Sequence, residues 1–305
     1  QIVEEHFRDK AEISGTALRL ARSLEVPDDE VHVIRAGGII GVHEILFGFP
    51  AQVVRLRHEA ISREAFGNGV FHCEAARGEF AAQGQGLRIA IGAGVMMIAL
   101  VGGRIVPAFT RNWLVQNNPG RLPVPPGQVF DKVALAVLLA AVGAWVLRPA
   151  DSTTAVLLGL AGLLHVLRLG RWAGDRTLGE PLLWILHLGY AFVPLGAIIL
   201  AAANFLPGTI APSAGQHLWT AGAIGVMTLA VMARATRGHT GRELVAGKGG
   251  VAVFAAVLLA ALTRIVAATG FPDVSLIHLS GTLWSAAFIG FALLHGKALV
   301  TRRGR

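Results

Sequence analysis

Seven apolar segments occupy the chain from Leu87 onward, and they constrain the fold more than any other feature of the sequence. Helices that cross a bilayer need about 20 apolar residues, because backbone polar groups in lipid must hydrogen-bond within their own segment. The sequence therefore predicts an all-α fold, a polytopic transmembrane helical bundle with seven spans. The predicted segments are residues 87–109, 132–147, 153–167, 182–206, 218–233, 250–269 and 275–296.

Two of these segments are short for a bilayer. Residues 132–147 and 153–167 are segments of only 16 and 15 residues, short for the roughly 30 Å of a hydrocarbon core. The sequence leaves two interpretations open. Both segments cross as thin spans with charged ends that reach the interface, or they form one re-entrant hairpin around residues 148–151.

Composition supports a membrane protein and excludes other classes. Hydrophobic residues make up 53% of the 305 residues and charged residues only 15%, where soluble domains carry about 25%. The single cysteine, Cys73, excludes an internal disulfide and a cysteine-cluster metal site. Basic turns on one membrane face account for the net charge of +8, so membrane lipids are the expected partners and nucleic acid is not.

The basic residues alternate from loop to loop, which predicts the orientation. Loops 110–132, 168–180, 234–249 and the tail 297–305 are rich in Arg and Lys, whereas the loops between them carry a single base, Arg148. Positive loops stay on the cytoplasmic side, so the C-terminus is predicted to be cytoplasmic and residue 86 to lie outside.

Residues 1–86 differ from the rest of the chain. They hold 13 of the 19 acidic residues and 9 of the 27 basic residues, and charges recur every few positions. The sequence thus divides into a polar N-terminal segment, 1–86, and a transmembrane domain, 87–305.

Charged groups inside the predicted spans are candidates for function, because they are costly in lipid. Arg104 follows two glycines and precedes Pro107, and Arg264 lies in the sixth segment. We predict that both help to bind a cofactor or substrate. For Arg104 the alternative is a side chain that reaches the membrane interface.

The histidines are the candidate metal ligands, since imidazole suits haem iron, copper and zinc. His217 and His239 flank one apolar helix, 22 residues or roughly 33 Å apart, so they predict two separate sites on opposite membrane faces. His187 is a third candidate, whereas His165 and His295 are expected to be packing residues. No zinc-hydrolase motif occurs, and no catalytic residue is predicted.

Several long motifs resemble the NnrS family of bacterial inner-membrane proteins. They are HEILFGF at 43–49, GGRIVPAFTRN at 102–112, LWILHLGYAFVPLG at 183–196, HLWTAGAIGVMTLAVMARATRGHTGR at 217–242 and WSAAF at 284–288. The resemblance implies a multi-pass protein of roughly twelve helices that contains haem and copper and is associated with denitrification and nitric oxide stress. It implies metal ligands at His43, His187, His217 and His239, with polar support from Arg104, Arg111 and Asn112.

The front of the chain departs from this pattern. In the family, the HExLFGF motif opens an apolar helix, but here the residues from Pro50 onward are polar. Seven spans with residue 86 outside imply five missing ahead of them, which agrees with the family's twelve. The expectation is therefore a truncated or rearranged N-terminus.

These observations predict a haem- and copper-binding inner-membrane protein that protects against nitric oxide, with nitric oxide or nitrosylated metal species as its partners. It is not expected to be an enzyme. Two alternatives stay open: a haem–copper oxidoreductase of the nitric oxide reductase kind, and a membrane transporter that uses the intramembrane arginines. The sequence does not determine the oligomeric state.

Overall fold

The computed structural model describes residues 67–78, 84–269 and 273–300. These described residues are helical, without a strand, and they contain seven helices or helical rods long and apolar enough to cross a membrane. The predicted all-α bundle with seven spans is thereby confirmed. The spans run Gln85–Asn117, Val129–Leu147, Ser152–Arg176, Pro181–Phe205, Pro212–His239, Gly247–Ala268 and Val274–Leu299.

Four of the seven spans are single helices and three are composites, of which the third joins α8 (Ser152–Gly170) and the short 3-10 helix η3 (Gly174–Arg176). The single helices in the second half are α9 (Pro181–Phe205), α12 (Gly247–Ala268) and α13 (Val274–Val300). The first span joins α5 (Gln85–Met97), the π-helix η2 (Ile98–Gly102) and α6 (Gly103–Asn117). The fifth joins α10 (Pro212–His217), the π-helix η4 (Leu218–Val226) and α11 (Met227–His239).

The two short segments form full-length helices. Helices α7 (Val129–Leu147) and α8 (Ser152–Gly170) have 19 residues each, or roughly 28 Å, which is close to the thickness of a hydrocarbon core. The structure thus favours two separate spans over a re-entrant hairpin. The connection is tight because the Asp151 carboxylate accepts a hydrogen bond from the backbone N–H of Thr153 at 2.8 Å and caps α8.

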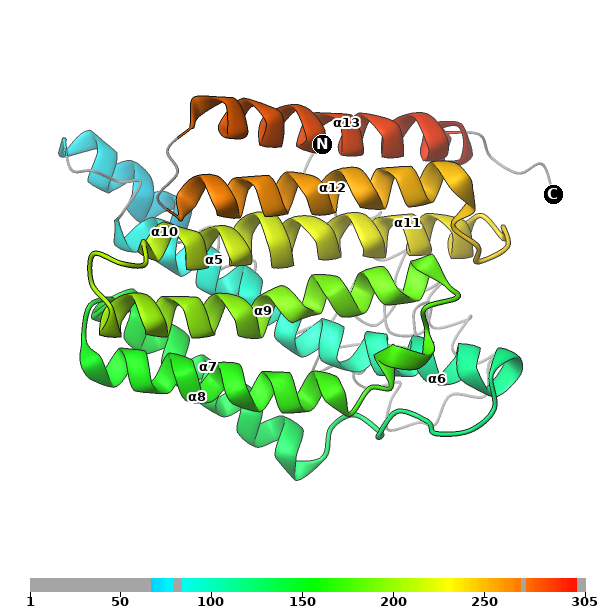
Figure 1. Ribbon diagram of the computed structural model, residues 1–305, viewed down its shortest axis with the longest axis horizontal. Coiled ribbons are helices and arrows are strands. Elements are labelled where there is room, and N and C mark those ends of the chain that lie inside the picture. The colour runs from blue at the N-terminus through cyan, green and yellow to red at the C-terminus, as the bar shows by residue number, and fades with distance from the viewer. Residues whose placement is uncertain (1–66, 79–83, 270–272, 301–305) are drawn as a thin grey trace, which may run out of the picture. The chain divides into compact units, whose positions relative to one another are not determined.

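Helix α9 lies at the centre of the bundle. It packs against α8 on one side and against the α10–η4–α11 rod on the other, and α12 and α13 follow outward from that rod (Figure 1). The first span contacts α7, α9 and η4. In an apolar stretch of 18 residues within each helix, 67% of α9 is buried inside the bundle, compared with 28% of α12 and 17% of α13. Helices α12 and α13 therefore form an edge with broad apolar faces.

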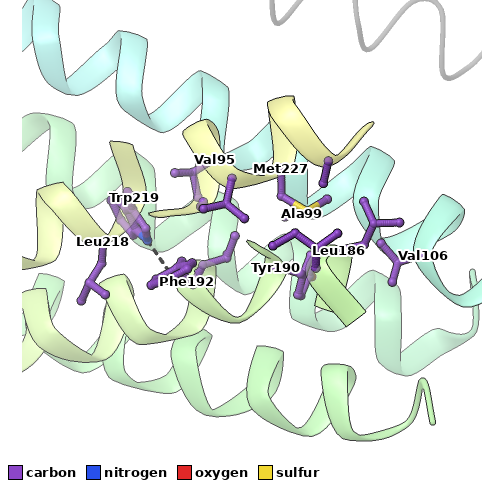
Figure 2. Packing of buried hydrophobic residues seen from close by; sticks show 14 of the residues in the cluster. Val95, Ala99, Val106, Leu186, Tyr190, Phe192, Leu218, Trp219 and Met227 are labelled. Carbon is purple, nitrogen blue, oxygen red and sulfur yellow. Dashed lines mark hydrogen bonds between the residues drawn. The ribbon is translucent and has the colours of Figure 1, made fainter. Parts of the chain in front are cut away.

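Glycines set the spacing between the central helices. A Cβ on Gly196 of α9 would lie 2.3 Å from Cδ1 of Trp219, which is completely buried in η4. The Trp219 indole donates to the carbonyl of Val193 at 2.9 Å, the dashed line in Figure 2, so the ring cannot swing away without losing a buried hydrogen bond. The helix contact thus depends on a residue without a side chain.

The His217–His239 stretch is one continuous helical rod. It keeps these two histidines at its opposite ends, but residues 218–226 follow a π-helix rather than an α-helix. π-helical turns shift the hydrogen-bond register and occur often at functional sites. The apolar pattern of the sequence does not distinguish this register from an α-helix.

Candidate functional site

A buried polar network lies between the first span and helices α7, α8 and α9. The Arg168 guanidinium, 1% exposed, donates from Nε to a carboxylate oxygen of Asp131 at 3.0 Å. Its Nη1 donates to the hydroxyl of Tyr190 at 2.9 Å and to the backbone carbonyl of Ala99 at 2.8 Å. The Tyr190 hydroxyl lies 2.7 Å from Nδ1 of His165. Four side chains from three helices and one backbone carbonyl thus form a single network.

The hydrogen-bond partners determine where the protons lie. Nε2 of His165 is 3.2 Å from the carbonyl oxygen of Ala134, which can only accept, so Nε2 carries the proton. Nδ1 of the neutral ring then accepts from the Tyr190 hydroxyl, whose oxygen accepts in turn from Arg168. Both ring nitrogens of His165 are therefore used, in agreement with its predicted packing role.

The network also supplies a hydrogen-bond donor to a backbone carbonyl in the π-helical segment of the first span. Ala99 lies in η2, where the changed register leaves carbonyls without their usual partners, and Arg168 supplies a donor there. Gly103 permits this approach, since a Cβ at that position would lie 2.3 Å from Nη2 of Arg168. Tyr190 stands beside Ala99 and Met227 in the same region (Figure 2).

Sequence reasoning missed this network. Arg168 and Asp131 lie at the ends of apolar segments, in the loops whose bases set the orientation. Nothing in either residue's local pattern distinguished a buried ion pair from solvated loop charges. The available signal was that an Asp and an Arg flank two adjacent apolar helices, 131 at the start of α7 and 168 near the end of α8.

His187 is the most buried of the predicted ligands that the structure describes. The ring is 8% exposed and packs beside Trp172, with the ring centroids 6.4 Å apart. Nδ1 lies 3.0 Å from the carbonyl oxygen of Leu183, one helical turn earlier, and Nε2 lies 3.4 Å from the hydroxyl of Thr110. A Cβ on Gly174 would lie 2.5 Å from Cδ2 of this ring.

The hydrogen bond of His187 to Leu183 selects one tautomer of the ring. Because a carbonyl oxygen can only accept, Nδ1 carries the proton and Nε2 keeps its lone pair. The Thr110 hydroxyl has a nearer acceptor, the carbonyl of Val106 at 2.9 Å. A backbone hydrogen bond to Trp172 also acts on the ring. This is the arrangement by which proteins orient a metal-binding imidazole.

His217 and His239, the other predicted ligands that the structure describes, belong to the α10–η4–α11 rod and not to α9. His217 is half-buried at the junction of α10 and η4, and the charge of Arg264 acts on it, so the structure brings these two predicted residues together. His239 is exposed at the end of α11. His43 lies outside the described residues. Within the described ranges, no three His, Cys, Asp or Glu side chains come together as a metal site.

The predicted polar support is less concentrated than the sequence suggested. Arg104, Arg111 and Asn112 all lie on α6 with exposed side chains. In the described part of the chain, no hydrogen bond joins any of them to His187 or His217. The side chain that α6 does contribute to His187 is Thr110, which is fully buried and was not singled out from the sequence.

The comparison with known families assigns most of the chain. The NnrS protein family matches residues 61–303, which include all the described spans and every quoted motif except HEILFGF. This chain belongs to the NnrS family. The membership agrees with the resemblance drawn from the motifs after residue 87.

A second family matches the front of this NnrS chain. Residues 1–87 match the C-terminal part of dihydrodipicolinate reductase, so HEILFGF at 43–49 falls in that region and outside the NnrS match. The sequence patterns did not indicate this relation, and the HEILFGF motif was predicted to belong to the NnrS pattern. His43 lies outside the NnrS match, so the family match does not support its predicted role as a metal ligand.

The curated relatives are reductases of the same kind as this second family. A 4-hydroxy-tetrahydrodipicolinate reductase of Clostridium novyi (strain NT) is 32% identical over 96 residues, covering 24% of this chain and 38% of that protein. One of Thermosipho africanus (strain TCF52B) is 39% identical over 64 residues, covering 21% of this chain and 29% of the relative. The chain thus spans about a third of the length of these relatives. No solved structure matches it.

Proposed function

We propose that the NnrS part of this chain binds haem through His187 and protects cellular metal centres against nitric oxide in the bacterial inner membrane, with its C-terminus cytoplasmic. The observation that carries the proposal is the available Nε2 of His187. A haem iron needs one or two axial imidazoles, so a single well-oriented histidine can hold it.

The residues around His187 fit such a group. The Leu183 carbonyl fixes the tautomer, and Trp172 and Gly174 form an apolar wall against the ring. Burial of the ring also limits the access of water to a bound group. When bound, haem would supply an iron centre able to take up nitric oxide, and the chain itself would orient the imidazole and exclude water.

For copper we propose His239 and His43. His217 was also predicted as a metal ligand, but it lies near the other end of the same rod from His239, so these two histidines cannot hold one ion. The charge of Arg264 beside His217 opposes a second cation there and favours an anionic group, such as a carboxylate of the cofactor. Arg104, Arg111 and Asn112 are exposed and could bind polar edges of a cofactor only from the surface of α6. For His187, the hydrogen bond to Leu183 already selects the nitrogen that would act as a ligand.

A substitution series tests the haem proposal. We expect His187→Ala to remove most of the Soret absorbance per purified protein, because the iron loses its axial nitrogen. His278→Ala is the matched control, since His278 is exposed at the start of α13 and should leave the spectrum unchanged. His187→Gly should regain the band when imidazole is added.

Two outcomes would contradict parts of this proposal. A full Soret band in His187→Ala would show that His187 is not the axial ligand. Stoichiometric metal in the single alanine variants of His43, His187, His217 and His239 would remove the whole set of proposed ligands. Steady consumption of nitric oxide with an electron donor would favour the oxidoreductase alternative instead.

A further inference from the structure

Helices α11 and α13 end on the same side of the bundle and bring three cationic or donor side chains together. The two helices contact each other, and their C-terminal ends lie on the same side in Figure 1. Arg237 lies two residues before the end of α11, and Arg242 lies in the turn that follows. His295 lies four residues before the end of the last span.

His295 has an unused donor. The side chain is 6% exposed and its ring packs against Phe291, with centroids 4.9 Å apart. Nδ1 is buried without any hydrogen-bond partner in the described part of the chain. With no acceptor at Nδ1, the ring proton belongs on Nε2, the nitrogen that is not enclosed. In this tautomer Nε2 of His295 is an N–H donor.

The charges acting on this ring are both positive. They come from Arg237 and Arg242. Arg237 uses Nε to bond the carbonyl of Glu243 at 2.7 Å, and Arg242 donates its backbone N–H to the carbonyl of Arg237. Within the described residues, neither guanidinium forms an ion pair with a carboxylate. The sequence has no acidic side chain between Glu243 and Asp273 or after Asp273.

We propose that Arg237, Arg242 and His295 bind one phosphate group, supplied by the headgroup of an anionic phospholipid. Guanidinium groups bind phosphate oxygens through paired charge-assisted hydrogen bonds, and an imidazole N–H adds a third donor. The partial negative charge at the ends of α11 and α13 opposes an anion, but two full positive charges outweigh it. The site is independent of the haem proposal.

The neighbouring surface favours a lipid over free phosphate. Leu293, Leu294 and Leu299 of α13 are 79%, 43% and 60% exposed and flank His295 along the same helix. Only 17% of the apolar 18-residue stretch of α13 is buried. An acyl chain lying along this face would be continuous with a headgroup at the helix end. Inorganic phosphate would gain nothing from these leucines.

Native mass spectrometry of the purified full chain tests the site, with equal amounts of phosphatidylglycerol and phosphatidylcholine in the detergent. We expect wild type to retain phosphatidylglycerol preferentially. Arg237→Gln and Arg242→Gln should each lower the retained ratio about fivefold, the effect of one basic residue at a membrane surface. His295→Phe should lower it as well, while keeping the packing against Phe291.

The controls separate charge from site and lipid from phosphate. Arg171→Gln removes one charge from the loop after α8, where Arg171 bonds Gln128, and should leave the ratio unchanged. Arg237→Lys should regain part of the preference. An unchanged ratio in both glutamine variants, with circular dichroism as in wild type, would overturn the proposal. Binding of radiolabelled inorganic phosphate without any preference for phosphatidylglycerol would overturn the lipid as its source.

Discussion

Arg168→Met is expected to cause the largest loss of stability of any single substitution in the transmembrane domain. It leaves the Asp131 carboxylate buried without its cation and removes the donors to Tyr190 and Ala99. Breaking one partner of a buried ion pair costs about 3–5 kcal/mol. We expect a correspondingly lower midpoint of thermal unfolding in detergent, followed by near-ultraviolet circular dichroism.

Arg171→Met is the matched control for this experiment. Arg171 lies three residues further along the chain, but its guanidinium bonds Gln128 near the surface and lies 4.6 Å from the ring of Phe130. Its loss should cost about 1 kcal/mol or less. Equal effects of the two substitutions would contradict the network as the structure shows it. The double substitution Arg168→Met with Asp131→Leu should regain much of the stability, because no buried charge is then left unpaired.

Gly196→Ala is expected to have the second largest effect. The added methyl would lie 2.3 Å from Trp219 Cδ1 and 2.4 Å from its Nε1. The ring is completely buried, so either α9 and η4 separate or the bond to Val193 breaks. Overpacking of this kind costs about 1–3 kcal/mol. Thermal unfolding and the tryptophan fluorescence spectrum would both report the change.

Gly143→Ala controls for the intrinsic effect of replacing a helical glycine. Nothing lies within 4 Å of a Cβ at Gly143 of α7, so the substitution should be neutral or stabilising by up to about 1 kcal/mol. A similar loss of stability in both alanine variants would show that the contact with Trp219 does not set the helix spacing.

The spans were predictable because burial in lipid imposes one strong constraint, a long apolar helix. The alternation of basic loops supported the same seven spans and predicted their orientation. Segment ends were less certain. Residues 129–131 and 168–170 belong to helices α7 and α8, although Asp131 and Arg168 looked like loop residues. Their charges are compensated by each other, and that pairing exists only after the helices pack.

The candidate site was predictable only in part. His187 could be chosen from the sequence because a histidine in an apolar helix is a potential ligand. Its availability depends on the Leu183 carbonyl and on Thr110, which comes from a helix 77 residues away along the chain. The π-helical register of η2 and η4 left no trace in hydrophobic periodicity, because nearly every side chain in those segments is apolar.

The π-helical turn at residues 98–102 also sets how far α6 is rotated relative to α5 within the first span. Each residue of an α-helix turns the chain by about 100° and advances it by about 1.5 Å. Deleting one residue from η2 to restore a regular helix would rotate all of α6 by that angle relative to α5. Thr110 would then leave His187, and Gly103 would no longer face Arg168. These five residues thus set the rotation of α6 about the axis of the span, and with it the neighbours that the side chains of α6 contact.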